Sequence, residues 1–246
     1  MECERMGYWE NTTYLQHPDT SAVADAITAL FAEEGMRRIA RPPRREPNTQ
    51  EPMQYAGALQ NNLWGVAVIP GNREWTIIKT APFELLGERA PGCSRMRIVE
   101  LAGRLRVPGF QLNVHDGSDA VMVETDGRGR CLLSGFTGSG VDPDDPLLFH
   151  EERLSGDRIT VGFELLPLEP RMIASPDPTT ALIDYHALAG SLAAALAGTN
   201  SSLRDNMTCL DLIEHKPLPI SGAHDLYFEW PARDRSFEWP GGDRSD

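Results

Sequence analysis

Three apolar runs between residues 109 and 136 constrain the fold of this chain most strongly. FQLNVH, AVMVET and CLLSGF follow one another, separated by the short segments DGSD and DGRGR. Asp-Gly pairs tolerate the positive φ that tight hairpin turns require. The three runs therefore predict a three-stranded antiparallel meander.

The first of these runs alternates strictly between apolar and polar residues. Its two faces carry Phe110, Leu112 and Val114 on one side, and Gln111, Asn113 and His115 on the other. Alternation of this kind is typical of an antiparallel sheet with one packed face and one face toward water. We therefore expect the polar side chains of this strand to lie on the wetter face.

The remaining elements follow from periodicity and turn residues. Helices are predicted at 20–35, 94–105 and 179–198, a hairpin at 63–69 and 74–80, and single strands before residue 20, at 158–166 and at 225–230. Hairpins outnumber possible crossovers, so the sheet should be mainly antiparallel. The predicted fold class is α+β, with a mainly antiparallel sheet and about three helices packed on one face.

Residues at the ends of the predicted helices indicate where each one stops and starts. Asp19, Thr20 or Ser21 can cap the first helix, and Gly35 can take the left-handed conformation that closes it. Ser94 is the expected cap of the second helix, which Pro108 ends.

The 246 residues suit a single α+β domain spanning residues 1–230. Residues 36–52 hold four prolines and five arginines, which predicts a long exposed loop. Residues 231–246 are expected to form a flexible tail. This tail carries most of a nine-residue tandem copy, in which FEWPARDRS (228–236) is followed at once by FEWPGGDRS (237–245).

The net charge of −13 limits the classes of partner. A negative field of this size repels phosphate backbones, so nucleic-acid binding is not expected, whereas a basic protein partner is favoured. No stretch approaches the roughly 18 apolar residues of a membrane helix. Residues 1–13 lack the basic-then-apolar order of a secretory signal, so no such signal is expected. A cytoplasmic location is therefore expected. The preference for arginine over lysine favours a bacterial source with a GC-rich genome.

Candidate catalytic residues are few. Cys93 precedes a predicted helix, where the helix dipole would lower the pKa of its thiol, and His115 is the nearest histidine in sequence. Together they would form a Cys–His pair of a hydrolase or transferase. The alternative is a small thiol at a loop–helix junction. Acylation at Cys3, which would attach the chain to a membrane, is a further possibility.

Metal and cofactor motifs are absent from the sequence. No P-loop, zinc ribbon or H-E-x-x-H motif occurs, so neither a cofactor nor a metal is expected. The nearest alternative is a metal site on the 110–125 hairpin. If residues 111 and 124 pair across it, Gln111, Asn113, His115 and Glu124 share one face.

Two further groups of residues suit recognition. The arginines offer bidentate contacts to carboxylate or phosphate groups, and they could bind an acidic partner or a phosphorylated ligand; they are Arg37, Arg38, Arg41, Arg44 and Arg45. Phe237 and Trp239 of the second tail copy could anchor in the groove of a partner. The simpler interpretations are a solvated loop and a tolerated duplication.

These patterns combine into one leading hypothesis and one alternative. The leading hypothesis is a cytoplasmic binding protein without catalysis, acting through its surface as an inhibitor, an immunity protein or a regulatory factor does. The alternative is a hydrolase or transferase that uses Cys93 with His115, or a metal site on the hairpin.

Overall fold

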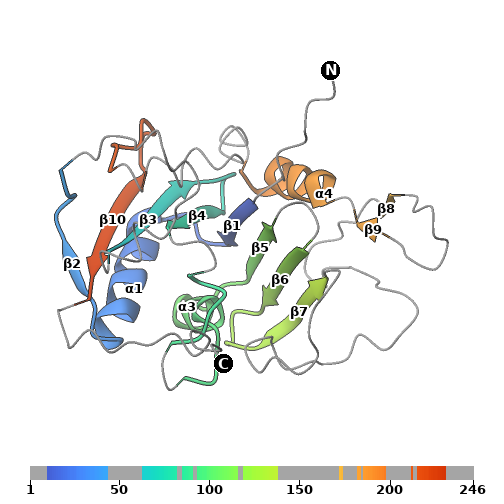
Figure 1. Cartoon of the computed structure of the whole chain (residues 1–246), viewed down its shortest axis with the longest axis horizontal. Helices are drawn as coiled ribbons and strands as arrows, with labels where there is room; N and C mark the ends of the chain where they lie inside the picture. Colours follow the sequence, from blue (N-terminus) through green and yellow to red (C-terminus); the bar gives the residue numbers. More distant parts are fainter. Residues whose placement is uncertain are drawn as a thin grey trace, which may run out of the picture.

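The fold is taken from a computed structural model. It describes residues 10–43, 63–81, 85–90, 93–115, 119–137, 172–173, 182–183, 185–197, 212 and 215–230. Within these ranges the chain forms one large antiparallel sheet with helices against both of its faces (Figure 1). The predicted α+β class and antiparallel sheet are confirmed.

The large sheet contains eight strands. They are β1 (Glu10–Leu15), β2 (Arg37–Ile39), β3 (Leu63–Pro70), β4 (Thr76–Ala81), β5 (Gly109–His115), β6 (Asp119–Thr125), β7 (Cys131–Thr137) and β10 (His224–Glu229). A separate two-stranded pair is formed by β8 (Met172–Ile173) and β9 (Leu182–Ile183). The helices are α1 (Thr20–Glu33), α3 (Arg97–Leu105) and α4 (Tyr185–Leu192), and the π-helix η1 (Ala193–Ala197) continues α4.

The strand order places the first strand of the chain inside the sheet. The order is β2-β10-β3-β4-β1-β5-β6-β7, and every neighbouring pair is antiparallel. The hairpin β3–β4 and the meander β5–β6–β7 join strands that are consecutive in sequence, as predicted. β1 bridges these two local units by pairing with β4 on one side and β5 on the other.

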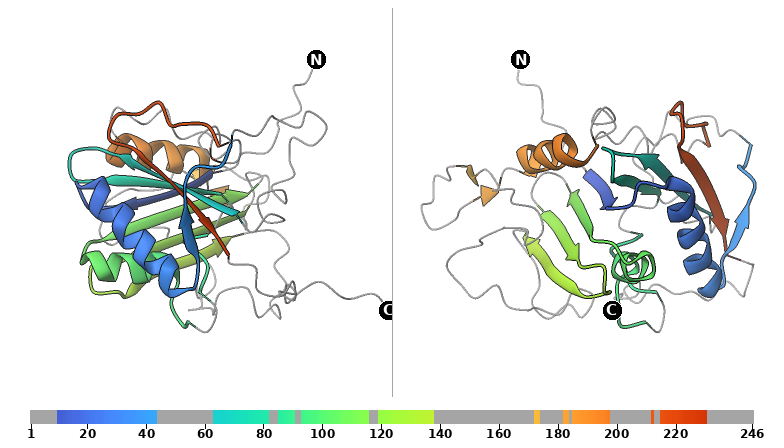
Figure 2. Two further views of the ribbon diagram at one scale, coloured as in Figure 1. Left: turned by 90° about the vertical axis from the view of Figure 1, so that its left-hand side faces the viewer. Right: turned by 180° about the vertical axis from the view of Figure 1, so that it is seen from behind.

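The two faces of the sheet bury different helices (Figure 2). We call them the α1 face and the α4 face. The apolar cluster on the α1 face packs α1 and α3 against residues such as Leu15 and Ile78. The cluster on the α4 face packs α4 and η1 against their strand neighbours, Tyr14 and Ile77. The expected placement of the helices on one face therefore holds for α1 and α3, whereas α4 covers the opposite face.

Helix α1 begins and ends as its sequence predicts. The carboxylate of Asp19 accepts hydrogen bonds from the backbone N–H groups of Ser21 and Ala22, at 2.8 and 3.3 Å. These bonds satisfy donors that have no partner inside the helix. Gly35, just past the last turn, has φ +91°, a conformation in which a side chain would be strained.

Helix α3 begins later than predicted, because its first donors are satisfied by another segment. The N–H of Arg97 donates to the carbonyl of Glu88 at 2.9 Å, and that of Ile98 to the carbonyl of Leu86 at 2.8 Å. Met96 occupies the N-cap position without a side-chain bond. The prediction that Ser94 caps this helix is therefore wrong, since backbone carbonyls of residues 86 and 88 take that role.

Helix α4 and η1 are held by the turn between β3 and β4. Within the predicted 179–198 helix, residues 182–183 form β9 and the helix itself begins at Tyr185. The backbone N–H of Asn72 donates to the carbonyl of Leu196 at 2.7 Å, and its side-chain amide donates to Ala195 at 3.2 Å. A Cβ on Gly71 would lie 2.7 Å from the carbonyl oxygen of Leu196, so this close approach requires glycine.

The predicted 36–52 loop is partly a strand. Arg37–Ile39 form β2, which pairs with β10 at one edge of the sheet. The expectation of a loop over these three residues is wrong, because their pairing partner lies almost 200 residues away and leaves no local pattern. Residues 44–52 lie outside the described residues, as do the predicted strand 158–166 and the tail 231–246. The domain boundaries therefore stay a prediction.

The first tail copy contributes to the core. Phe228 is 1% exposed and meets Phe31 edge-on, with ring centroids 4.8 Å apart. Trp230 meets Trp64 in the same way at 5.5 Å. Perpendicular ring pairs of this kind add to the burial of apolar area. The prediction that Phe228 and Trp230 pack is confirmed, whereas the second copy, including Phe237, lies outside the described residues.

We expect the two tail copies to contribute very differently to stability. Phe228→Ala removes a fully buried ring and should lower the free energy of unfolding by about 3–5 kcal/mol. The matched substitution Phe237→Ala in the second copy should change it by less than about 0.5 kcal/mol. Urea denaturation followed by circular dichroism measures both. Equal losses in the two variants would contradict the prediction that only the first copy contributes to the stability of the fold.

Asp126 organises the turn between β6 and β7. Its carboxylate accepts hydrogen bonds from the backbone N–H groups of Arg130 and Arg128, at 3.0 and 2.9 Å, and from the guanidinium of Arg130 at 2.9 Å. The backbone bond from Arg130 is the main reason why the pKa of Asp126 lies below its ordinary value of 3.8. The ionised carboxylate is therefore the form that fits the folded turn.

This lowered pKa predicts the direction of a pH dependence. The stabilisation from Asp126 is fully present above the ordinary pKa of 3.8 and is lost as the pH falls through the lower pKa of the folded state. Asp126→Asn should therefore be less stable than the native chain at pH 7, and the difference should shrink as the pH falls below about 4. Denaturation at a series of pH values tests this. Asp25→Asn, on the exposed side of α1, is the control.

Candidate functional site

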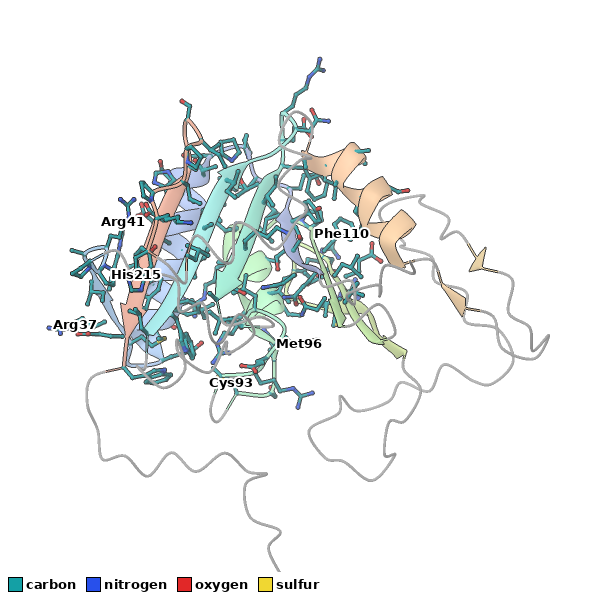
Figure 3. All side chains as sticks on the ribbon, turned by 45° about the horizontal axis from the view of Figure 1, so that its top comes forward. Arg37, Arg41, Cys93, Met96, Phe110 and His215 are labelled. Atoms are coloured by element: carbon teal, nitrogen blue, oxygen red, sulfur yellow. The ribbon has the colours of Figure 1, made fainter. Side chains whose placement is uncertain are left out.

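The predicted arginine group lies partly along the edge of the sheet, where it meets β10 (Figure 3). Arg37 stands opposite Glu229 in the β2–β10 register and forms an ion pair with it. Arg41 forms an ion pair with Asp225. We call these two pairs the charged seam. Just beyond it, Nδ1 of His215 lies 2.8 Å from the carbonyl oxygen of Pro43, which can accept its hydrogen.

The charged seam explains why arginines gather in an acidic chain. Two of the five predicted arginines neutralise carboxylates of the adjacent strand, so they hold β2 to β10. Arg38 is exposed, and Arg44 and Arg45 lie outside the described residues. Binding of an anionic ligand by the whole group stays a prediction, but Arg37 and Arg41 would have to leave their carboxylates to take part.

Cys93 is a free, exposed thiol at the lower end of the sheet in Figure 3. It lies four residues before Arg97, the first residue of α3. The first N–H groups of that helix are already bonded to the carbonyls of Glu88 and Leu86. The expectation that Cys93 directly adjoins a helix with free donors is therefore wrong. His115 is the last residue of β5, and its side chain lies outside the described side chains, so the Cys93–His115 pair stays a prediction.

The register of β5 and β6 rules out the shared face on which the hairpin metal site depended. Gln111 pairs with Val123, and Glu124 pairs with Phe110. Glu124 therefore points to the α4 face, away from Gln111 and Asn113. The expected pairing of residues 111 and 124 is wrong by one position, and one position reverses the face of every side chain. Among the described residues no three His, Cys, Asp or Glu side chains gather as a metal site.

The polar side of β5 is buried, where sequence alternation predicted a wetter face. Gln111 and Asn113 are each 1% exposed and lie on the α1 face. The segment 85–90 passes over them, and a Cβ on Gly87 would stand 2.8 Å from Oε1 of Gln111. None of the four side-chain nitrogen and oxygen atoms of the two residues has a hydrogen-bond partner within the part of the chain that the structure describes. We call Gln111 and Asn113 the amide pair.

Arg97 fixes the segment that covers the amide pair. Its guanidinium is 3% exposed and forms two parallel bonds with the carboxylate of Glu34, at 2.9 Å each. It also donates to the carbonyl of Leu85 at 3.0 Å and lies 5.2 Å from the centroid of Trp64. One side chain thus joins the end of α1, the covering segment and α3. The sequence indicates the burial of Arg97 through its spacing. It lies four residues before the buried Leu101, so both side chains are on the same face of α3.

A serine and a histidine that sequence reasoning did not single out also meet in the structure. Oγ of Ser21 lies 3.3 Å from Nε2 of His224, at the start of α1. A hydrolase needs such a contact and also free donors for the developing oxyanion. The N–H groups of Ser21 and Ala22 are instead bonded to Asp19. This contact therefore joins α1 to β10, and the two nearest backbone N–H groups in the described part of α1 are not free to bind an oxyanion.

Comparison with known proteins assigns neither a family nor a function to this chain. No family model, no curated protein and no solved structure matches the chain. Within the described ranges, none of the helices has both the length and the apolar character needed to span a membrane. Cys3, Phe237 and Trp239 lie outside the described residues, so their predicted roles stay predictions.

We expect Arg97 to be among the costliest residues to remove. Arg97→Ala leaves the nearly buried carboxylate of Glu34 without its counter-charge, which should cost about 3–5 kcal/mol in the free energy of unfolding. The double variant Arg97→Met, Glu34→Leu removes both charges and should lose less. Arg104→Ala, which breaks the more exposed pair with Glu33, is the control and should lose less than Arg97→Ala. Urea denaturation of the three variants tests this, and a double variant weaker than Arg97→Ala would contradict it.

Proposed function

We propose that this protein is a cytoplasmic binding protein without catalysis, which acts through its surface on a basic protein partner. Inhibitors, immunity proteins and regulatory factors work in this way. The observation that carries the proposal is how the arginines are used. Five of the described arginines form ion pairs with carboxylates of the same chain: Arg37 and Arg41 along the charged seam, Arg97 in the core, and Arg104 and Arg130 nearer the surface.

Internal ion pairs remove equal numbers of positive and negative charges, so the acidic surplus remains. The chain has 36 Asp and Glu residues against 23 Lys and Arg residues, and 36 minus 23 leaves 13 negative charges. An acidic surplus of this size steers basic proteins toward the surface and raises their association rate. The ion pairs also disfavour the competing hypothesis, in which the arginine group binds an acidic partner. Arg37 and Arg41 would first have to break their contacts with Glu229 and Asp225.

The proposal predicts a partner of opposite charge and a dependence on salt. Affinity capture from the native host should yield a basic protein that binds the purified chain stoichiometrically. Its association rate should fall roughly tenfold or more between about 0.05 and 0.5 M salt, because screening weakens long-range attraction. Stopped-flow or surface-based kinetics with both purified proteins measures this rate.

A variant of the charged seam separates the two binding hypotheses. The double variant Arg37→Gln, Arg41→Gln makes the surface more acidic, so it should bind the basic partner as fast as the native chain or faster. If the arginines themselves contact the partner, the same variant loses binding. An acidic partner, or an association rate that is independent of salt, would also refute the proposal.

A further inference from the structure

A second group of arginines lies where the turn between β6 and β7 contacts α3 (Figure 1). A Cβ on Gly127 would come within 2.7 Å of the carbonyl group of Arg106, and one on Gly129 would lie 3.6 Å from a guanidinium nitrogen of the residue at position 95. Arg128 stands between the two glycines. Because consecutive Cα atoms are about 3.8 Å apart, the Cα atoms of Arg106 and Arg128 lie within about 10 Å of each other. We call Arg95, Arg106 and Arg128 the turn arginines.

The turn arginines differ from the charged seam in how weakly they are paired. Arg106 and Arg128 are exposed, and neither forms an ion pair with another residue in the described part of the chain. The side chain of Arg95 is 62% exposed and lies 3.8 Å from the carboxylate of Glu100. That carboxylate is shared with Arg104, at 3.4 Å. Their guanidinium groups are therefore available to a further anion.

The carboxylates next to the turn arginines are engaged by other groups. Glu33 pairs with Arg104, and Asp126 pairs with Arg130. With Glu100, three carboxylates accompany five guanidinium groups, and five minus three leaves two positive charges. This end of α3 is thus a basic patch on a chain whose net charge is −13.

The backbone of Arg106 supports a role for its side chain. Arg106 follows the last turn of α3 in the left-handed conformation, with φ 57° and ψ 41°. Glycine is the usual residue at such a position, because a side chain is strained there. A positive charge near the last carbonyls of the helix offsets part of this cost. Since strained residues gather at binding sites, an exposed arginine in this conformation indicates that the side chain itself is used.

The chemistry of the patch selects a compact anion with two charges. Guanidinium groups bind phosphate through pairs of parallel hydrogen bonds. A phosphorylated side chain carries about 1.5 to 2 negative charges at pH 7, which matches the surplus of the patch, whereas a carboxylate carries one. A long polyanion is disfavoured, because most of its charges would lie outside the patch, in the negative field of the chain.

The open position of the turn arginines favours a phosphate carried by another protein. Small molecules are usually held in concave sites that bury most of their surface. Arg106 and Arg128 are instead exposed on a helix end and a turn, and the glycines of that turn contact the helix. Exposed arginine clusters of this kind recognise phosphorylated segments of proteins.

We propose that the turn arginines bind a phosphorylated side chain of a protein partner. Its phosphoryl group lies against the turn at residues 127–129, where Arg106 and Arg128 supply the two unpaired charges. Arg95 exchanges its long contact with Glu100 for the phosphate. This role does not depend on the acidic surplus that steers the basic partner proposed above, so either proposal can fail without the other.

A short peptide tests the proposal. The probe is acetyl-Gly-Ala-Ser-Ala-Gly-amide phosphorylated at its serine, and the controls are the unphosphorylated peptide, the peptide with glutamate in place of serine, and inorganic phosphate. The full-length native chain is titrated at low salt, and the arginine Nε–Hε resonances are followed in ¹⁵N-correlated NMR spectra. The phosphopeptide should shift those of Arg106 and Arg128 at millimolar concentration or below, and inorganic phosphate should compete with it. The glutamate peptide should bind at least about tenfold more weakly, because it has less charge and fewer acceptor oxygens.

Three outcomes of this titration would overturn the proposal. Equal binding of the glutamate peptide would assign the patch to acidic segments in general. Binding of inorganic phosphate without binding of the phosphopeptide would assign it to a small free anion. No shift with any of the four compounds would leave the turn arginines as a solvated surface.

Substitutions locate the binding. Arg106→Gly removes a guanidinium and relieves the left-handed backbone, so it should unfold at the same or a higher urea concentration and bind the phosphopeptide about tenfold more weakly. Arg128→Gln should lose a similar factor. Arg73→Gln is the matched control and should keep the native affinity. Arg73 is also exposed and left-handed, with φ 41°, but it lies in the turn that contacts η1 on the opposite face of the sheet.

Phosphopeptide binding that survives both Arg106→Gly and Arg128→Gln overturns the proposal, and so does an equal loss in Arg73→Gln. If one of the variants fails to fold, the comparison of the peptides on the native chain still decides.

Discussion

The ion pair between Arg97 and Glu34 is the interaction on which the α1 face depends. Arg97 is nearly inaccessible to water and reaches the end of α1, the carbonyl of Leu85 and the ring of Trp64 from a single position in α3. A buried guanidinium is stable only when its donors are matched by acceptors in fixed positions. The pair therefore specifies where two helices and one irregular segment lie relative to one another, and with them what covers the centre of the sheet.

At the edge of the sheet, ion pairs likewise join segments that are far apart in the sequence. β2 is only three residues long. Its backbone pairs with β10, and the ion pairs of Arg37 and Arg41 with β10 add to this contact. Short, charged edge strands resist pairing with other chains, because their side chains keep foreign backbones away. Residues 37–39, which composition predicts to be a loop, are thus an edge strand of the sheet. Arg37 and Arg41, which suggested anion binding, form ion pairs with the neighbouring strand β10.

Local patterns in the sequence predict most of the elements, and long-range contacts decide the rest. The Asp-Gly turns and the alternation of residues 109–136 predict the meander, and Asp19 and Gly35 bound α1 as expected. Alternation separates two faces but does not say what covers each, so burial of Gln111 by a segment around Gly87 could not be foreseen. The pairing of Phe110 with Glu124 depends on the exact length of a turn, and a difference of one residue moved a candidate metal ligand to the other face.

The position of β10 has a consequence for the order in which the chain folds. This strand is the last of the sheet in sequence, but it lies between β2 and β3. A ribosome releases the meander and the β3–β4 hairpin long before it releases residues 224–229, so those local units can form early while β3 keeps an unpaired edge. Until β10 is synthesised, the nascent protein therefore exposes an edge of β3 to which another strand could pair.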